Sequence, residues 1–401
     1  MWKSIKLENV CQIGDGNHSS NYPKASEMVE QGVPFLRAGN IQNGGISDNN
    51  LKFITPEKHI ILKKGHLKKG DVLITNRGDI GKIAIVPKKF EGANLNSQIA
   101  WLRPDERLLS SYLYYFLKVT CSKSSFKSLQ TGTALQQLTI REIKKLDILL
   151  PSLEEQKKIV VKLDSAFADI DKAINLARNK KDNVEKLQSS LLSSMLIGDL
   201  KTFKKVKLSE LFNVGSSKRV LKSDWKNEGV PFYRGREITT LSKLDLVNNK
   251  LFITEEHYQL LADKYGVPQA GDIMVTAIGT IGNTYIVKAS DKFYFKDASV
   301  LCLKRVSEVS SEYIQYFFKS KFFFSQLDKG NGATVDTLTI KKLASIVIAI
   351  PSITEQRLIV DKLDTAFAEL ENIKIYITKT EVNFKSLKET ILKQELQSEA
   401  A

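Results

Sequence analysis

Residues 151–168 read PSLEEQKKIVVKLDSAFA, and residues 351–368 repeat this stretch as PSITEQRLIVDKLDTAFA. The two copies lie 200 positions apart in a chain of 401 residues. A repeat at half the chain length indicates that one structural unit occurs twice. The sequence therefore predicts a fold with an internal two-fold relationship between its halves.

Each copy of the repeat begins with a signal that starts a helix. Ser152 and Glu155 match the S-x-x-E capping box, in which each side chain accepts a hydrogen bond from a backbone N–H of the first turn. Ser352 and Glu355 form the same pair in the second copy. A proline before each serine ends the preceding strand or loop.

Apolar residues then recur at steps of three and four, the period of an amphipathic helix and of a coiled-coil seam. In the first copy these are Ile159, Leu163, Phe167, Ile170, Ile174, Ala177, Val184, Leu187 and Leu191. In the second they are Ile359, Leu363, Phe367, Leu370, Ile373, Ile377, Phe384, Leu387 and Ile391. Gly198 is the expected stop of the first helix.

A helix of about 45 residues is a rod of roughly 65–70 Å with one apolar stripe, and that stripe needs a partner. The nearest partner is the other copy, which would pack antiparallel about a two-fold axis. The alternative is a helix folded back against its neighbouring domain. The sequence leaves both arrangements open.

The remainder of each half also contains short repeated motifs. Gly-Val-Pro-Phe occurs at 32–35 and 229–232, Gly-Asp before an apolar strand at 70–75 and 271–276, and Leu-Thr-Ile at 138–140 and 338–340. We expect strands at 72–75 and 82–86 with a tight turn between Gly78 and Gly81. Residues 111–117 and 312–318 read as amphipathic helices whose aromatic residues favour core packing over base stacking. Short repeated segments separated by divergent sequence are expected of two related domains that recognise different targets.

Charge is unevenly distributed along the chain, whose net charge is +15. Residues 1–150 carry +9 and residues 201–350 carry +8, whereas 151–200 are neutral and 351–401 carry −2. This partition indicates attraction of the two large segments to a polyanion such as nucleic acid. A generally basic surface that only keeps the protein in solution would show no such partition.

Other features exclude several classes of protein. No apolar run is long enough to span a bilayer, and the N-terminal residues do not resemble a signal peptide. Cys11, Cys121 and Cys302 are best explained as small apolar residues in a reducing cytoplasm. The chain has no phosphate-binding loop and no Pro-Pro of the amino-methyltransferase type. We therefore expect a non-catalytic protein.

The polar motifs do not change that expectation. His18, His59, His66 and His257 lack metal-ligand spacing. His59 and His66 lie among lysines, which suits phosphate contact or a solvated loop better than zinc. Gly14-Asp15-Gly16 is too short for a dinucleotide fingerprint, and we expect a turn there.

Taken together, the two basic domains, each closing with Leu-Thr-Ile and Pro-Ser-x-x-Glu-Gln before a long helix, resemble the DNA-specificity subunit of type I restriction-modification systems. The resemblance covers nearly the whole chain. It implies an α+β fold with two mixed α/β target-recognition domains (1–150 and 201–350), separated by two long antiparallel coiled-coil helices (151–200 and 351–401) in a pseudo-two-fold repeat.

The resemblance also implies a division of labour. Each domain would read one half of a bipartite site in double-stranded DNA, and the helices would set the spacing. Two methyltransferase (M) subunits carrying S-adenosylmethionine would methylate adenine N6, and restriction (R) subunits would use ATP and Mg²⁺. This chain would bind no cofactor, metal or membrane and would act in the cytoplasm. The alternative is a stand-alone DNA-binding or scaffold protein without methyltransferase partners.

Contacts to DNA are expected from loop residues of two kinds, although each of these side chains could equally serve the fold or be solvated. The expected phosphate contacts are Lys63, Lys64, Lys68, Lys88 and Lys89 in the first domain and Lys218, Arg219 and Lys222 in the second. The expected base-edge contacts are Arg37, Asn40, Asn76, Arg77, Ser217, Arg234, Arg236 and Thr276.

Overall fold

The computed structural model describes residues 2–17, 22–120, 137–197, 203–327 and 337–397. Three residues discussed above, His18, Cys121 and Gly198, lie outside these ranges. The chain divides into two units. The first contains Met1–Ala177 with Lys379–Ala401, and the second contains Arg178–Thr378.

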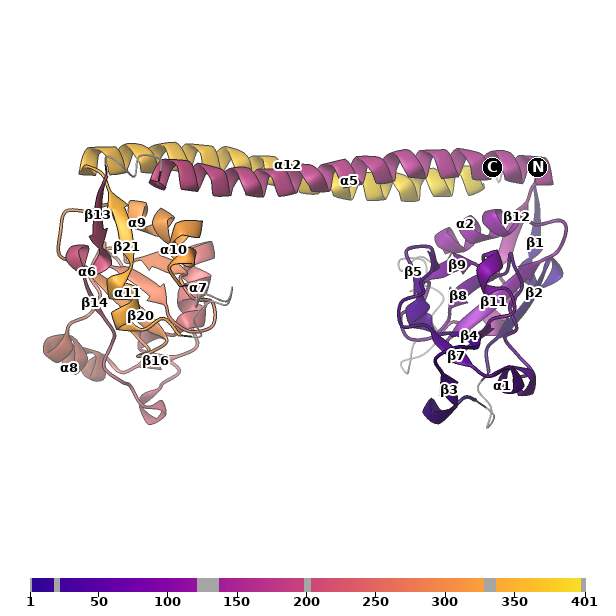
Figure 1. Ribbon diagram of the computed structural model, residues 1–401, viewed down its shortest axis with the longest axis horizontal. Helices are drawn as coiled ribbons and strands as arrows, with labels where there is room; N and C mark the ends of the chain where they lie inside the picture. The colour runs from indigo at the N-terminus through magenta and orange to yellow at the C-terminus, as the bar shows by residue number, and fades with distance from the viewer. Residues whose placement is uncertain (1, 18–21, 121–136, 198–202, 328–336, 398–401) are drawn as a thin grey trace. The chain divides into compact units, whose positions relative to one another are not determined.

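The globular part of the first unit contains twelve strands and three α-helices within its described residues (Figure 1). Its strands are β1 Lys3–Lys6, β2 Cys11–Asp15, β3 Met28–Val29, β4 Val33–Leu36, β5 Ile41–Gln42, β6 Gly45–Ile46, β7 Lys52–Ile54, β8 Val72–Thr75, β9 Ile83–Ile85, β10 Asn94–Leu95, β11 Ile99–Pro104 and β12 Asp147–Leu150. Its helices are α1 Pro56–Ile61, α2 Ser110–Thr120 and α4 Ile140–Lys144.

The second unit has the same order of main elements. Its strands are β13 Lys204–Lys207, β14 Phe212–Gly215, β15 Val230–Tyr233, β16 Phe252–Ile253, β17 Ile273–Thr276, β18 Thr284–Ile286, β19 Tyr294–Phe295, β20 Val300–Arg305 and β21 Val347–Ile350. Its helices are α6 Leu208–Leu211, α7 Gly235–Leu244, α8 Glu255–Tyr265, α9 Ser311–Phe318, α10 Lys321–Ser325 and α11 Ile340–Ser345. The long helices α5, Leu153–Ile197, and α12, Ile353–Gln397, each contribute to both units.

The sheets repeat between the units. The order β2-β11-β8-β9 in the first unit corresponds to β14-β20-β17-β18 in the second, and the pair β1-β12 corresponds to β13-β21. These strands pair antiparallel, whereas β4 with β10 and β15 with β19 are parallel pairs. The prediction of two mixed α/β domains is therefore confirmed.

One difference between the units follows the Gly-Val-Pro-Phe strand. In the first unit a short 3₁₀ turn, Ala38–Asn40, leads into the β5-β6 hairpin. In the second unit the same position starts the ten-residue helix α7. The repeated scaffold thus carries different insertions at this point.

The start of each long helix is built as the capping box predicts. The Ser152 nitrogen lies 2.9 Å from a carboxylate oxygen of Glu155, and the Glu155 nitrogen lies 3.3 Å from the serine hydroxyl. The corresponding distances for Ser352 and Glu355 are 3.0 and 3.3 Å. The backbone hydrogen bond from Ser152, followed by the one from its hydroxyl, lowers the pKa of Glu155.

Within each unit the two long helices run antiparallel. In the first unit Lys162 pairs with Glu395 at 2.6 Å, and Asp171 pairs with Lys388 at 2.5 Å, so one residue number rises as the other falls. In the second unit Leu192 and Leu196 of α5 share a core with Val360 and Leu363 of α12.

The start of each helix also packs against its own domain. Leu163 is fully buried in one core with Val72 and Ile74 of β8 and Tyr112 of α2. The two arrangements left open by the sequence therefore occur together. The predicted seam is wrong at Leu187, Ile373 and Leu387, which are 48%, 46% and 43% exposed.

Within the described ranges, no helix combines the length and apolar character needed to cross a membrane. Cys11 and Cys302 are buried free thiols, as predicted, and burial raises the pKa of each to about 12.

Candidate nucleic-acid interface

The β8-β9 and β17-β18 turns share one hydrogen-bonded frame. The Thr75 hydroxyl donates to the Asp79 carbonyl at 2.7 Å and accepts from the Lys82 nitrogen at 3.0 Å. Thr276 makes the equivalent bonds to Thr280 and Asn283, and its side chain is fully buried. Thr276, expected to contact a base, is thus committed to the fold of its own turn.

The tips of these turns differ. Asn76 is buried, and its Oδ1 has no hydrogen-bond partner among the described residues. Arg77 is exposed, whereas Ile278 occupies the corresponding position in the second unit and is 47% exposed. Of the predicted base-contacting residues in these two turns, Arg77 is the one that presents an exposed side chain.

The repeated arginines organise the loops that follow their strands. Arg37 donates to the Asn50 carbonyl at 2.9 Å, and its backbone nitrogen donates to the Asn40 side chain at 3.0 Å. Asn40 is buried and also donates to the Ser47 and Asn49 carbonyls. Both side chains therefore have internal partners in the loop that carries β5 and β6.

Arg234 and Arg236 converge on one buried carboxylate. Glu237 lies 3.0 Å from Arg234 and 2.5 Å from Arg236. Burial alone would raise the pKa of Glu237, but hydrogen bonds from the two arginines outweigh burial and hold its pKa below its usual value. Arg236 is 63% exposed and can still present part of its guanidinium to a ligand.

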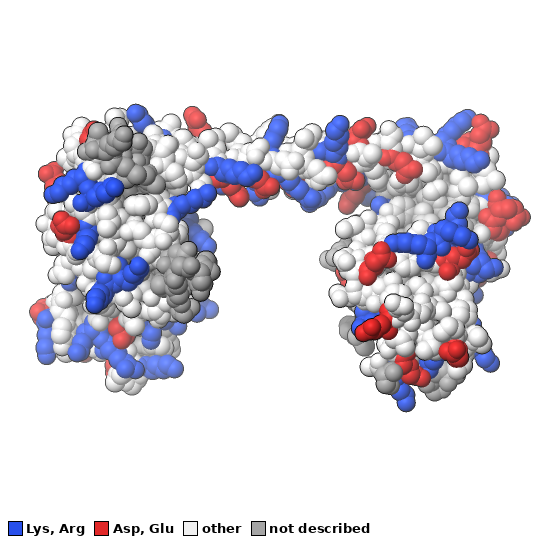
Figure 2. All heavy atoms as spheres, viewed as in Figure 1, with Lys and Arg blue, Asp and Glu red and all other residues white. Residues whose placement is uncertain are grey.

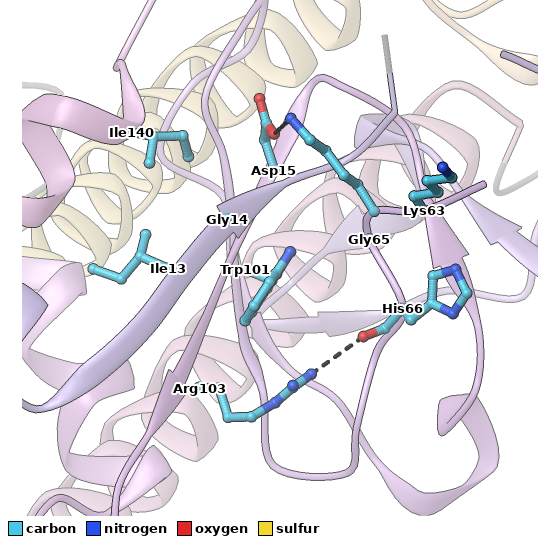
Figure 3. A pocket seen from close by; sticks show the side chains of 10 residues that line it. Ile13, Gly14, Asp15, Lys63, Gly65, His66, Trp101, Arg103 and Ile140 are labelled. Atoms are coloured by element: carbon cyan, nitrogen blue, oxygen red, sulfur yellow. Dashed lines mark hydrogen bonds and ion pairs between the residues drawn. The ribbon is translucent and has the colours of Figure 1, made fainter. Parts of the chain in front are cut away.

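Lys63 and Lys64 line a hollow of about 620 Å³ in the first unit (Figure 3). Trp101, Arg103 and His66 join them, although the sequence did not single out the first two. The complete lining is Ile13, Gly14, Asp15, Lys63, Lys64, Gly65, His66, Trp101, Arg103 and Ile140. Lys68 is exposed on the same loop but does not line the hollow.

Trp101 forms one wall of this hollow. Its indole packs against Gly14, where a Cβ atom would come within 2.7 Å of the ring. The prediction of a turn at residues 14–16 is wrong for Gly14 and Asp15, which belong to β2 because they pair with Trp101 and Ala100 of β11. The Arg103 guanidinium lies 4.7 Å from the centre of the indole ring (Figure 3).

Charged side chains surround that ring. Arg103 pairs with the buried Asp71 at 2.7 Å and donates to the His66 carbonyl at 3.2 Å. Lys64 lies 3.9 Å from Asp15. Burial, together with the charge of His66, lowers the pKa of His59, whose ring centre lies 4.1 Å from that of His66. An aromatic face beside several cations suits a base and its phosphate.

The second unit has a hollow at the corresponding place, with a volume of about 190 Å³. Gly215 and Gly266 occupy the positions of Gly14 and Gly65, and both Gly65 and Gly266 have positive φ, at 75° and 73°. The shared frame carries a different lining: Asn213, Gly215, Ser216, Ser217, Tyr265, Gly266, Tyr294, Phe295, Cys302 and Lys304.

Two predicted residues lie at this second hollow. Ser217 lines it and donates to the Phe295 carbonyl at 2.7 Å. Lys218 is exposed, and its ammonium lies 5.6 Å from the centre of the Tyr265 ring. In register, Trp101 and Arg103 of the first hollow correspond to Cys302 and Lys304 of the second, so the alignment of the two halves brings out Arg103 and Lys304 as cations at the same strand position.

The other predicted cations lie outside both hollows. Lys88 pairs with Glu91, and Lys89 pairs with Asp48 at 2.7 Å. Arg219 and Lys222 are exposed on the loop before β15. Lys and Arg predominate on the visible face of the second unit, whereas both signs are interspersed along the helices (Figure 2).

No metal centre competes with this interpretation in the part of the chain that is described. There, no group of three or more histidine, cysteine, aspartate or glutamate side chains is placed to hold an ion.

The chain matches one family along most of its length. The family described as "Type I restriction modification DNA specificity domain" matches residues 1–186 and again residues 200–379. The EcoKI specificity subunit of Escherichia coli is 23% identical, over 99% of this chain and 89% of that protein. The StySPI specificity subunit of Salmonella potsdam is 22% identical, with the same coverage.

Solved structures agree on the fold. A chain from a structure titled for complex assembly and conformational transition of the type I R-M system superposes with a TM-score of 0.76, covering 98% of this chain and 97% of that chain at 18% identity. The HsdS subunit from Thermoanaerobacter tengcongensis superposes with a TM-score of 0.60, covering 99% and 96%, also at 18% identity. At this identity the likeness establishes the fold alone.

Proposed function

Because the chain belongs to the family of type I restriction-modification DNA specificity proteins, we propose that each of its two domains reads one half of a bipartite site in double-stranded DNA. The observation that carries the proposal is that the family matches the chain twice, at 1–186 and at 200–379. Each match contains one complete copy of the β2-β11-β8-β9 or β14-β20-β17-β18 sheet. Two copies of one DNA-binding domain with different loops would be able to recognise two different half-sites.

The DNA contacts are proposed for exposed side chains of these domains. In the first unit we favour Lys63, Lys64, Lys68 and Arg77, and in the second Lys218, Arg219, Lys222 and Arg236. Lysine and arginine on exposed loops neutralise phosphates and, in the case of arginine, also reach guanine edges. The lining of each hollow, with Trp101 in one and Tyr265 in the other, would add a sequence-dependent contact.

The long helices are proposed to dock two methyltransferase subunits. Large apolar side chains on their surfaces stay exposed: Val161, Leu176, Val382 and Leu387 in the first unit, and Leu187, Leu358, Ile373, Ile375 and Tyr376 in the second. The pairs Leu176 with Tyr376 and Leu187 with Leu387 are one repeat length apart. Such repeated apolar positions suit two copies of the same partner.

We assign the chemical steps to the methyltransferase and restriction subunits. We propose that S-adenosylmethionine is held by the methyltransferase subunits and that ATP and Mg²⁺ are held by restriction subunits. This chain would only position those subunits on DNA. It would act in the cytoplasm, where the chromosome lies. The stand-alone scaffold remains the competing function, and it predicts no assembly with a methyltransferase.

Reconstitution with a type I methyltransferase subunit from the same organism tests the proposal. Size exclusion with light scattering should give a complex with two methyltransferase copies per chain, and adenine methylation mapped in cells should reveal one bipartite sequence that is lost when the gene is deleted. A chain that elutes alone and leaves the methylation pattern unchanged would support the scaffold instead. A mixture lacking this chain is the matched control.

A further inference from the structure

Gln156, the last residue of the repeated Pro-Ser-x-x-Glu-Gln motif, joins the first long helix to the first domain. Its side chain is fully buried. The amide nitrogen donates to the Arg107 carbonyl at 2.9 Å and to the Pro151 carbonyl at 3.0 Å. Its oxygen accepts from the Leu109 nitrogen at 2.8 Å. All three bonds go to backbone atoms, two of them in the segment that leads into α2.

Gln356 repeats this attachment in the second unit. It is 2% exposed, donates to the Pro351 carbonyl at 2.9 Å, and accepts from the Ser310 nitrogen at 2.9 Å. Ser310 directly precedes α9, the counterpart of α2. The same helix position therefore holds the same domain segment in both halves.

A second attachment lies about two turns farther along each helix. The Tyr115 hydroxyl donates to Asp164, and the Tyr115 ring stands edge-on to Phe167, with ring centres 5.5 Å apart at 85°. Burial, reinforced by the Asp164 carboxylate, raises the pKa of Tyr115, so its hydroxyl stays a donor.

The second unit again has the same contact. Tyr316 donates to Asp364, and its ring lies 5.5 Å from that of Phe367 at 88°. The repeated Lys-Leu-Asp and Ala-Phe-Ala segments of the sequence are thus the helix side of this attachment. Two attachments about 12 Å apart on one helix prevent the domain from pivoting about either one.

We propose that these contacts form a domain–helix lock, made of Gln156, Tyr115, Asp164 and Phe167 in the first unit and of Gln356, Tyr316, Asp364 and Phe367 in the second. The lock residues are positioning residues that make each recognition domain turn with its helix, so that the protein recognises the distance between half-sites as well as their sequences. This inference rests on the proposed reading of a bipartite site.

The lock predicts a specific defect. Without it, each domain keeps its own DNA contacts but changes its orientation on the helix. Binding of both half-sites by one protein then loses its advantage over binding of one half-site, because that advantage depends on both domains being held at the right separation. Discrimination against incorrect spacers should weaken for the same reason.

The test compares Gln156→Ala combined with Tyr115→Phe against a matched control, Gln394→Ala combined with Tyr114→Phe, each assembled with the methyltransferase. Gln394 is exposed on α12, and Tyr114 neighbours Tyr115 on α2. The probes are duplexes carrying the mapped site, the same site with one or two base pairs added or removed, and each half-site alone.

The lock variant should bind single half-sites within about twofold of wild type, while its preference for the full site falls about tenfold or more. It should also accept altered spacers that wild type and the control reject. Full-site preference and spacer discrimination equal to wild type would overturn the inference.

Misfolding gives a different result and is checked with a second variant. A collapsed first domain would lose its own half-site, so Tyr115→Phe alone, which keeps the ring, is measured in parallel. If that variant keeps both half-sites and the wild-type spacer preference, the lock is overturned. A wild-type protein that does not prefer a bipartite site would instead contradict the proposed function, so the two failures can be told apart.

Discussion

The side-chain oxygen of Gln156 accepts a hydrogen bond from the Leu109 backbone at 2.8 Å, across the junction between a long helix and a recognition domain. Gln356 and Ser310 form the same bond at 2.9 Å in the other half. The two halves differ in α7, in the β5-β6 hairpin and in the lining of their hollows, yet this hydrogen bond is kept, as is the bond from each glutamine to the carbonyl of Pro151 or Pro351. Attachment is therefore the constant part of the repeat, and recognition is the variable part.

Removing that glutamine should destabilise the first unit. Gln156→Ala leaves the partly buried Leu109 N–H without this acceptor, which lowers the free energy of unfolding by about 1–3 kcal/mol. Gln394→Ala, at an exposed position, should change it by less than about 0.5 kcal/mol. Urea unfolding followed by circular dichroism measures both, and equal stabilities would contradict the buried role of Gln156.

Leucines on the two sides of α5 should have separate effects. Leu163 is fully buried, and Leu163→Ala should cost about 2–5 kcal/mol of stability. Leu176 is 54% exposed, so Leu176→Ala should leave stability nearly unchanged but weaken assembly with the methyltransferase. Thermal unfolding and analytical size exclusion separate these outcomes. Normal assembly of the Leu176 variant combined with Val382→Ala would argue against docking on this surface.

Lysines at the first hollow should set the salt dependence of DNA binding. If Lys63 and Lys64 each neutralise one phosphate, the double alanine variant loses up to about 1.8 from the slope of log affinity against log salt. Lys157→Ala with Lys158→Ala, on exposed α5 positions, is the control of equal charge. Fluorescence anisotropy over a salt series gives both slopes. An unchanged slope would place these lysines away from DNA.

The two buried thiols should resist modification until the pH is high. Burial raises the pKa of Cys11 and of Cys302 to about 12, from an ordinary value of 9.0. A raised pKa in the folded protein stabilises it at pH values below the ordinary thiol pKa, and that contribution is lost as the pH rises toward 12.

In a Cys121→Ser background, iodoacetamide at pH 8 should therefore label the native protein slowly and the urea-unfolded protein fast. Native unfolding should become easier above about pH 9. Equal labelling rates in native and unfolded protein would show that the thiols are accessible.

Lengthening both helices together should lengthen the DNA spacer. Seven residues inserted after Ala177 and after Ile377 keep the apolar seam in phase and add about 10 Å, which corresponds to about three base pairs. Methylation mapping should then show both half-sites unchanged and a longer gap between them. Altered half-site sequences would contradict a spacer role for the helices. Insertion in one helix alone is the control, because it breaks the seam.

Much of the fold could be predicted because its signals are local. The Ser152–Glu155 and Ser352–Glu355 boxes fix where the helices start, and the repeat offset aligns the two sheets. The contact residues of the two long helices are harder to predict, because spacing alone does not say which of several apolar stripes is buried against the other helix. Leu187 and Leu387 fit the period of the helix but lie on its outer surface.

The site residues show a different limit. Thr276 and Asn40 are short polar residues next to loops, which favours them as base contacts, but such side chains often bond the nearby backbone, as both do here. Trp101 and Arg103 do not stand out in the sequence, because they lie within a strand, where alternation suggests packing. Their contribution to the hollow depends on Gly14 of the neighbouring strand, a pairing that a single sequence does not specify.

The glutamine bonds across each junction have a consequence for how such proteins diversify. Gln156 and Gln356 contact carbonyl and amide groups of the main chain in every one of their hydrogen bonds. These glutamine bonds do not depend on the side chains of the residues that they contact, so this part of the junction tolerates a changed loop sequence, whereas the second attachment still requires Tyr115 or Tyr316. We therefore expect a foreign recognition domain to seat on the same helix if it keeps this tyrosine, so that exchanging a domain would change the half-site without changing the attachment.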